Sequence, residues 1–132
     1  MSCAIRYAAA LIVLVVGDAL WLSYFARAVF RPTLGGILLE DVRWLAAVPF
    51  YLLFAAGIAY FAVTPALRTG SWPSAALSGA ALGFFAYMTY DLTNLATIKA
   101  WTVQLALVDM AWGTLISAAA ATASHFAAAR FA

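Results

Sequence analysis

The sequence predicts an all-α polytopic membrane protein, folded as an antiparallel bundle of four transmembrane helices. Of its 132 residues, 67% are hydrophobic and only 9% are charged, whereas a soluble domain carries about 25% charged residues. So few charges cannot cover a surface that meets water on all sides, and most of the surface should therefore face lipid. Four helices of about 20 residues use nearly the whole chain, which predicts one transmembrane domain over residues 1–132.

Prolines bound the first two predicted spans. The first span, residues 5–29, ends before Arg31-Pro32, because proline lacks the N–H that would continue the helix. The second span, residues 44–63, is followed by Pro65. The connection between these spans is expected to lie at the membrane interface, because apolar residues alternate there with charges. Its apolar residues are Ile37, Leu38, Leu39 and Val42.

A very short turn separates the last two predicted spans. The third span covers residues 74–97, and we expect Ser74, directly after Pro73, to cap its N-terminus. The fourth span covers residues 101–123. Because the turn at residues 98–100 is so short, these two helices should be antiparallel neighbours.

Tryptophans and glycines predict the surroundings of these helices. Trp44, Trp72 and Trp101 all fall at span ends, where indole rings settle among lipid headgroups as an aromatic belt. Gly79 and Gly83 form a small-xxx-small pair in the third span. Such a pair allows another helix to approach closely, either inside the bundle or between two protomers.

Three aspartates lie inside predicted spans rather than at their edges: Asp18, Asp91 and Asp109. An aspartate at the centre of a membrane helix costs about 2.5–3.5 kcal/mol on insertion scales. Three aspartates facing lipid would cost roughly three times as much. We therefore expect all three side chains to face the interior of the bundle.

The three acids are expected to meet at a common depth. The first and third helices run in one direction and the fourth runs back, so all three carboxyls fall in one slab, from mid-membrane towards the first and third connections. Each acid shares its helix face with polar or aromatic side chains three or four positions away. The candidate residues for ligand binding or proton relay are Asp18, Trp21, Tyr87, Asp91, Asn94, Asp109 and Trp112.

Two of these acids occur in the same pattern, Asp-x-x-Trp, at Asp18/Trp21 and at Asp109/Trp112. An indole N–H donates one hydrogen bond and a carboxylate accepts it. The pattern therefore predicts contacts between indole and carboxylate groups. Because the two copies lie on antiparallel helices, they form a crude pseudo-symmetric pair.

No basic residue lies deep enough in the membrane to pair with all three acids. Lys99 and Arg27 lie near helix ends, from which both side chains can reach the interface. Carboxyls close together in a low dielectric cannot all ionise, so we expect at least one to be protonated at neutral pH. That state suits proton-coupled transport or acid catalysis, and it equally suits a structural acid that is hydrogen-bonded.

The composition excludes several other kinds of site. The net charge is +2 and no basic run is present, so we expect no nucleic-acid partner. Cys3 is the only cysteine and His125 the only histidine. We therefore expect no disulfide within the chain and no metal site built from the usual His and Cys ligands. The sequence indicates no particular cofactor.

Three short motifs carry a resemblance to a known family. They are Asp-x-x-Trp-Leu at residues 18–22, Tyr-Asp-Leu-Thr-Asn at 90–94 and Asp-Met-Ala-Trp-Gly at 109–113. With them, the chain resembles over most of its length a bacterial family of predicted membrane proteins, domain of unknown function 2177. The resemblance implies a four-helix protein of the bacterial inner membrane and implies no particular activity.

Three hypotheses for function remain open at this point. The first is a polar intramembrane site, centred on Asp18, Asp91 and Asp109, that binds or transports a small molecule, a lipid or a cation. A small four-span transporter needs two copies to enclose a pathway, so this hypothesis implies a homodimer among membrane lipids. The second is a structural or accessory subunit whose buried acids are interhelical hydrogen-bond glue. The third is a small membrane enzyme that acts on a lipid or isoprenoid and uses one aspartate as general acid.

Overall fold

A computed structural model describes residues 2–25, 28, 31–35 and 43–131, and every regular element within these ranges is a helix. The all-α prediction is confirmed for this part of the chain. The predicted interfacial stretch at residues 37–42 lies outside the described residues, and so does Arg27. The elements in chain order are α1 (Ser2–Phe25), α2 (Arg31–Leu34), α3 (Trp44–Gly57), η2 (Ile58–Val63), α4 (Thr64–Thr69), α5 (Trp72–Thr97) and α6 (Val103–Phe131).

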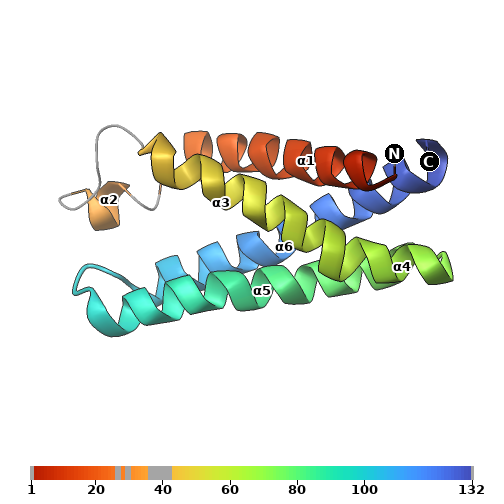
Figure 1. Cartoon of the computed structure of the whole chain (residues 1–132). Helices are drawn as coiled ribbons and strands as arrows, with labels where there is room; N and C mark the ends of the chain where they lie inside the picture. The colour runs from red at the N-terminus through yellow and green to blue at the C-terminus, as the bar shows by residue number, and fades with distance from the viewer. Residues whose placement is uncertain (1, 26–27, 29–30, 36–42, 132) are drawn as a thin grey trace.

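The long helices lie side by side, with both termini at one end of the molecule (Figure 1). The short helix α2 and the turn from α5 to α6 lie at the opposite end. Helix α6 packs against α1, α5 and η2, so the last helix of the chain is central to the assembly. Helices α5 and α6 are antiparallel neighbours, as the short turn between them predicts (Figure 1).

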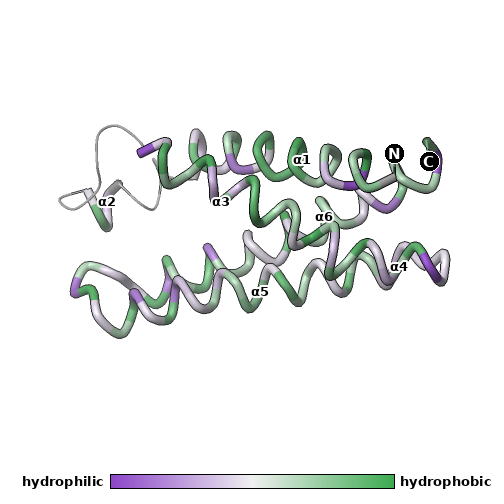
Figure 2. Tube along the Cα trace, in the orientation of Figure 1, coloured by the Kyte–Doolittle hydropathy of each residue, from purple (hydrophilic) through white to green (hydrophobic). Residues whose placement is uncertain are grey.

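Three helical stretches among the described residues are long and apolar enough to cross a membrane: Cys3–Tyr24, Trp44–Thr69 and Val103–Phe131. Helix α5 has 26 residues, a length of about 39 Å. It is not among the three because its second half is polar, and Figure 2 shows hydrophilic residues in the half of α5 near the turn to α6. Length and composition thus give three candidate spans among the described residues, and a fourth crossing by α5 stays a prediction.

The second long helix continues past the predicted end of its span at Val63. Pro65 would clash with a carbonyl one turn earlier in a regular α-helix. The π-helical segment η2, which has a wider turn and lies directly before Thr64-Pro65, accommodates the proline. The Thr64 hydroxyl donates to the carbonyl oxygen of Ala59 at 2.8 Å within this segment. The helix then ends at Gly70, whose φ of 69° is the left-handed conformation that glycine adopts most readily.

The N-terminus of α5 is capped by Ser71, three residues before the predicted cap. The Ser71 hydroxyl oxygen accepts a hydrogen bond from the backbone N–H of Ser74 at 3.2 Å. The prediction that Ser74 is the cap is therefore wrong: Ser74 is the donor in this interaction. The helix begins earlier because Pro73 fits the first turn, where its missing N–H is not needed.

Small residues bring α5 into close contact with α6. A Cβ atom at Gly83 would overlap the Ser117 side chain and the carbonyl oxygen of Gly113. A Cβ at Gly79 would likewise overlap the Ser117 backbone and the Ala121 side chain. The predicted small-xxx-small pair thus makes a contact inside the bundle, where only glycine allows this separation of the two helices.

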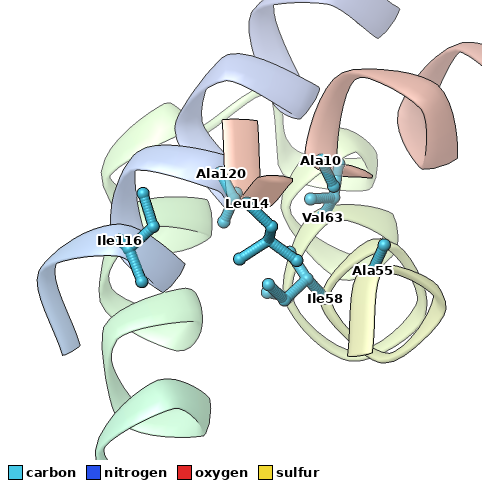
Figure 3. Packing of buried hydrophobic residues seen from close by; sticks show 9 residues of the cluster. Ala10, Leu14, Ala55, Ile58, Val63, Ile116 and Ala120 are labelled. Carbon is cyan, nitrogen blue, oxygen red and sulfur yellow. The ribbon is translucent and has the colours of Figure 1, made fainter. Parts of the chain in front are cut away.

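The hydrophobic core lies where α1, α3, η2 and α6 meet. Leu14 of α1 is fully buried and points toward Ile58 of η2 and Ala120 of α6 (Figure 3). Many other large apolar side chains, among them Leu45 and Leu77, are exposed on the outer surface. An apolar exterior around a small core is the distribution expected of a protein that lipid surrounds. This core joins α1, α3, η2 and α6 near the middle of their lengths.

Candidate functional site

The Asp18 carboxylate is held by two neutral donors from two other helices. The Tyr51 hydroxyl of α3 donates to Asp18 Oδ2 at 2.7 Å. The Trp112 indole N–H of α6 donates to Asp18 Oδ1, also at 2.7 Å. Asp18 itself is only 7% exposed. The carboxylate therefore has a defined orientation at the junction of α1, α3 and α6.

The two tryptophans of the repeated Asp-x-x-Trp pattern stack on each other. The ring centroids of Trp21 and Trp112 lie 4.6 Å apart, and the planes differ by 6°. Trp112 donates to Asp18 on the facing helix and not to Asp109 on its own helix. Asp109 and Trp112 lie three residues apart and therefore share one face of α6. From that face the Trp112 indole reaches across to α1. The repeated pattern thus joins α1 to α6.

The Asp91 and Asp109 carboxyls are close neighbours between α5 and α6. Asp91 has no exposed surface and Asp109 is 7% exposed. Ionised carboxylates carry no hydrogen, and the Asp91 oxygens meet no other donor in the described part of the chain. The pair is hydrogen-bonded only when it holds a proton, as expected for two carboxyls that share one buried location.

A cavity of about 570 Å³ lies between the helices beside these acids. Both Asp18 and Asp109 line it. Its volume falls within the 300–1,000 Å³ that is typical of small-molecule sites. Aliphatic lining comes from Leu22, Leu34 and Ala86. Aromatic rings make up most of the remaining lining, from Trp21, Phe50, Tyr51, Tyr87, Tyr90, Trp101 and Trp112.

The cavity has a buried inner part and an exposed rim. Trp21 and Trp101 are buried in the inner part, like the two acids. Three lining residues are exposed at the surface of the protein and form the rim. The rim residues are Leu22, Phe50 and Tyr90. The buried acids are thus reached through an apolar rim.

The Tyr87 ring lies directly over a glycine of the facing helix. A Cβ atom at Gly113 would overlap the ring carbons of Tyr87. The absence of a side chain at Gly113 therefore lets the Tyr87 ring lie close against α6, where it lines the cavity. Two successive residues of α6 thus shape the site. Trp112 donates a hydrogen bond to Asp18, and Gly113 leaves room for the Tyr87 ring.

Five of the seven predicted site residues line the cavity. These five are Asp18, Trp21, Tyr87, Asp109 and Trp112. Asp91 lies outside the lining and contacts the site through Asp109. Asn94, one turn further along α5, is partly buried and is not part of the lining. The structure therefore places five of the predicted residues in the cavity wall and two outside it.

No base neutralises the acids of the cavity within the residues that the structure describes. Neither Asp18 nor Asp109 makes an ion pair there. Lys99 is exposed at the end of α5. Arg6 lies on α1 more than three turns before Asp18, and its guanidinium donates to Thr64 at 2.6 Å. Within the described part of the chain, the Asp18 carboxylate is held only by hydrogen bonds from neutral groups.

A family described as predicted membrane protein, DUF2177, matches residues 3–126 of the chain. The chain belongs to the DUF2177 family of predicted membrane proteins. The match covers every cavity residue, and its description agrees with the three apolar helices of the structure. The resemblance inferred from the sequence motifs is thereby confirmed. No curated protein and no solved structure matches the chain.

Two cavity residues of this DUF2177 protein were not among the predicted set. Tyr51 carries the only hydroxyl of α3, a signal that the sequence offered in an otherwise apolar helix. Trp101 was assigned to the aromatic belt, and this prediction is wrong. Trp101 is only 8% exposed and packs with Leu34 and Leu105, whereas Trp44 is 66% exposed. The close return of α6 after the turn places Trp101 inside the bundle.

Proposed function

We propose that this DUF2177 protein is a four-span protein of the bacterial inner membrane that binds a small molecule, a lipid or a cation in its acidic cavity. One observation carries the proposal: two buried aspartates from different helices, Asp18 and Asp109, line one cavity of about 570 Å³. Ionisable residues inside a membrane are costly, and they usually face a bundle interior or a functional cavity. A cavity of this volume beside them supports ligand binding.

The cavity also favours binding over a purely structural role. Interhelical glue accounts for the hydrogen bonds to Asp18 and for the pair of Asp91 with Asp109. Those hydrogen bonds do not by themselves require the open pocket that extends from the buried acids to the exposed rim. A site that serves only to hold helices together gains nothing from a cavity bounded by two carboxyls.

The distribution of side chains on α5 supports its proposed membrane crossing. Asp91 is completely buried on one face of the helix, against α6. The large apolar residues Phe84, Phe85 and Leu92 are exposed on the remaining surface. A helix with its acid inside and its apolar residues outside is suited to lipid contact. A homodimer is part of this proposal, and the exposed rim offers an apolar surface that a second copy could cover.

Native mass spectrometry of the purified protein, released from nanodiscs of bacterial lipid extract, tests the proposal. Ala86 lines the cavity, so Ala86→Leu fills part of it. Ala81 is exposed on the same helix, so Ala81→Leu is the matched control. We expect a bound species on the wild type and on Ala81→Leu, and a clear loss of it on Ala86→Leu. Equal occupancy in the two variants, or none in any, would contradict the proposal.

A further inference from the structure

We infer that the ligand of this cavity is an amphipathic organic ammonium ion, with its nitrogen near Asp18 and Asp109 and its apolar part at the rim. The inference rests on the proposed binding function and names the chemical class of ligand. Four features of the cavity carry it: the charge of the acids, the aromatic lining, the apolar rim and one buried donor.

The charge of the cavity calls for a cation. Both donors to Asp18, the Tyr51 hydroxyl and the Trp112 indole, are neutral groups. They hold the carboxylate in place without cancelling its charge. Asp109 brings a second acid to the same cavity, and neither acid makes an ion pair in the described ranges of the chain. A positively charged ligand would supply the missing counter-charge.

The aromatic lining selects an organic cation over a metal ion. Rings such as the stacked Trp21 and Trp112, together with Tyr87, attract alkylated ammonium groups through their faces. Calcium and magnesium ions need a shell of oxygen ligands that aromatic rings do not provide. The described residues contain no group of three or more His, Cys, Asp or Glu side chains placed to hold a metal ion.

The rim indicates that the ligand has an apolar part. Leu22, Phe50 and Tyr90 are exposed, whereas Asp18 and Asp109 are buried behind them. In a bilayer this rim lies among acyl chains. A ligand with a charged end and an apolar end could enter from the lipid and keep its apolar end at the rim.

One buried donor in the cavity wall still lacks an acceptor. Trp101 lines the cavity and is 8% exposed, and its indole N–H has no acceptor among the described residues. A buried indole N–H usually finds a partner. An oxygen near the nitrogen of the ligand would satisfy it. An ammonium group with a nearby oxygen occurs both in soluble amino alcohols and in lipid headgroups.

A matched pair of probes tests the inference on the purified full chain in maltoside micelles. The charged probe is the octyl ether of choline, and its neutral analogue has carbon in place of nitrogen. Binding is followed by tryptophan fluorescence, because Trp21, Trp101 and Trp112 line the cavity. We expect the charged probe to bind at least about tenfold more tightly than the neutral one. Equal affinities, or tighter binding of the neutral probe, would overturn the inference.

Variants connect the preference to the residues that carry it. Asp18→Asn should bring the ratio of the two affinities close to one, whereas Asp18→Glu keeps the charge and should retain the preference. Trp101→Phe keeps a ring and removes the N–H. It should weaken binding of the choline ether more than binding of a decyltrimethylammonium probe, which has no oxygen. The inference is overturned if Asp18→Asn still prefers the charged probe to the neutral one and Trp101→Phe weakens both charged probes equally or not at all. The probes would then bind elsewhere.

Two competitors distinguish the source of the ammonium group. Competition by phosphatidylcholine added to the micelles assigns the site to lipid headgroups, and competition by choline alone assigns it to soluble amines. The failure of this inference is distinct from failure of the proposed function. If Ala86→Leu removes a bound species but the charged probe has no advantage, the cavity binds a ligand of another class. If Ala86→Leu changes neither the bound species nor the binding of the charged probe, both proposals fall.

Discussion

The Trp112 indole N–H donates to the Asp18 carboxylate at 2.7 Å, across 94 residues of sequence. This hydrogen bond joins α1 to α6 at the depth of the cavity. Its acceptor is also bound by Tyr51 of α3, and its donor ring stacks on Trp21 of α1. Three helices therefore depend on one carboxylate for their relative positions beside the cavity.

Removing this donor should weaken the bundle measurably. Trp112→Phe retains an aromatic ring for the stack with Trp21 and loses the hydrogen bond to Asp18. We expect a loss of about 1–2 kcal/mol in the free energy of unfolding, measured in detergent. Trp72→Phe is the control, because Trp72 is half exposed and makes a ring contact with Phe126 only at 6.0 Å. Equal stabilities of the two variants would contradict the assigned role of Trp112.

Two substitutions at Asp18 separate its structural role from its binding role. Asn retains an oxygen that can accept from Tyr51 or Trp112, so Asp18→Asn should stay folded with nearly the wild-type melting temperature. Leu accepts nothing and leaves two buried donors unpaired, at a cost of about 1–3 kcal/mol each. The preference for a positively charged ligand should be lost in both variants. If Asp18→Asn binds ligand as the wild type does, the acid is only structural.

The pair of Asp91 and Asp109 should tolerate an amide. In Asp91→Asn the amide N–H can donate to the Asp109 carboxylate, so the stability in detergent should stay close to that of the wild type. Asp91→Leu removes the carboxyl that neighbours Asp109 and should lower stability by about 1–3 kcal/mol. Infrared spectra at neutral pH provide a second measurement. The band of a protonated carboxyl should be present in the wild type and absent from Asp91→Asn.

A Gly→Ala substitution should lower stability where the glycine contacts another helix, and it should not lower stability where the glycine faces open space. A Cβ at Gly83 would overlap Ser117 and the Gly113 backbone. Gly83→Ala should therefore lower the free energy of unfolding by about 1–3 kcal/mol, the usual effect of overpacking. Gly57 lies in helix α3 with nothing near its Cβ position. Gly57→Ala should be neutral or stabilising by up to about 1 kcal/mol, and a loss of stability there would show that the helix packing differs from the one described.

Single-cysteine labelling determines whether α5 crosses the membrane. In a Cys3→Ser background, cysteines are placed at Ser71 before α5 and at Lys99 after it. A membrane-impermeant maleimide applied to one side of sealed vesicles should label only one of the two positions if α5 spans the bilayer. Labelling of both positions from the same side would exclude the fourth crossing.

Local signals in the sequence predicted most of the helical framework. Apolar stretches of about 20 residues predicted the helices, and the short turn at residues 98–100 predicted that α5 and α6 are neighbours. The ends of helices were less well predicted. Ser71, and not Ser74, caps α5, and the second helix continues through Pro65 because a π-helical segment accommodates the proline. These details depend on competing local interactions that composition does not rank.

The candidate site could be predicted only in part. The cost of an acid in a membrane predicted that Asp18, Asp91 and Asp109 would be buried, and their burial follows from that cost alone. The cost says nothing about which groups stabilise them. Tyr51 and Trp101 were missed because each lies on a segment whose rotation about its axis and approach to its neighbours arise from packing with the other helices.

By itself, the sequence determined that the chain is helical, that it belongs in a membrane and that its acids lie inside, because each of these follows from the free energy of moving side chains between water and lipid. Only the tertiary structure decided that Trp112 serves Asp18 and not Asp109, that Asp91 lies outside the cavity wall, and that a cavity remains between the helices. Spacing along one helix specifies which side chains share a face. The partner of that face depends on the depth, rotation and crossing of a second helix, which are set by packing throughout the bundle.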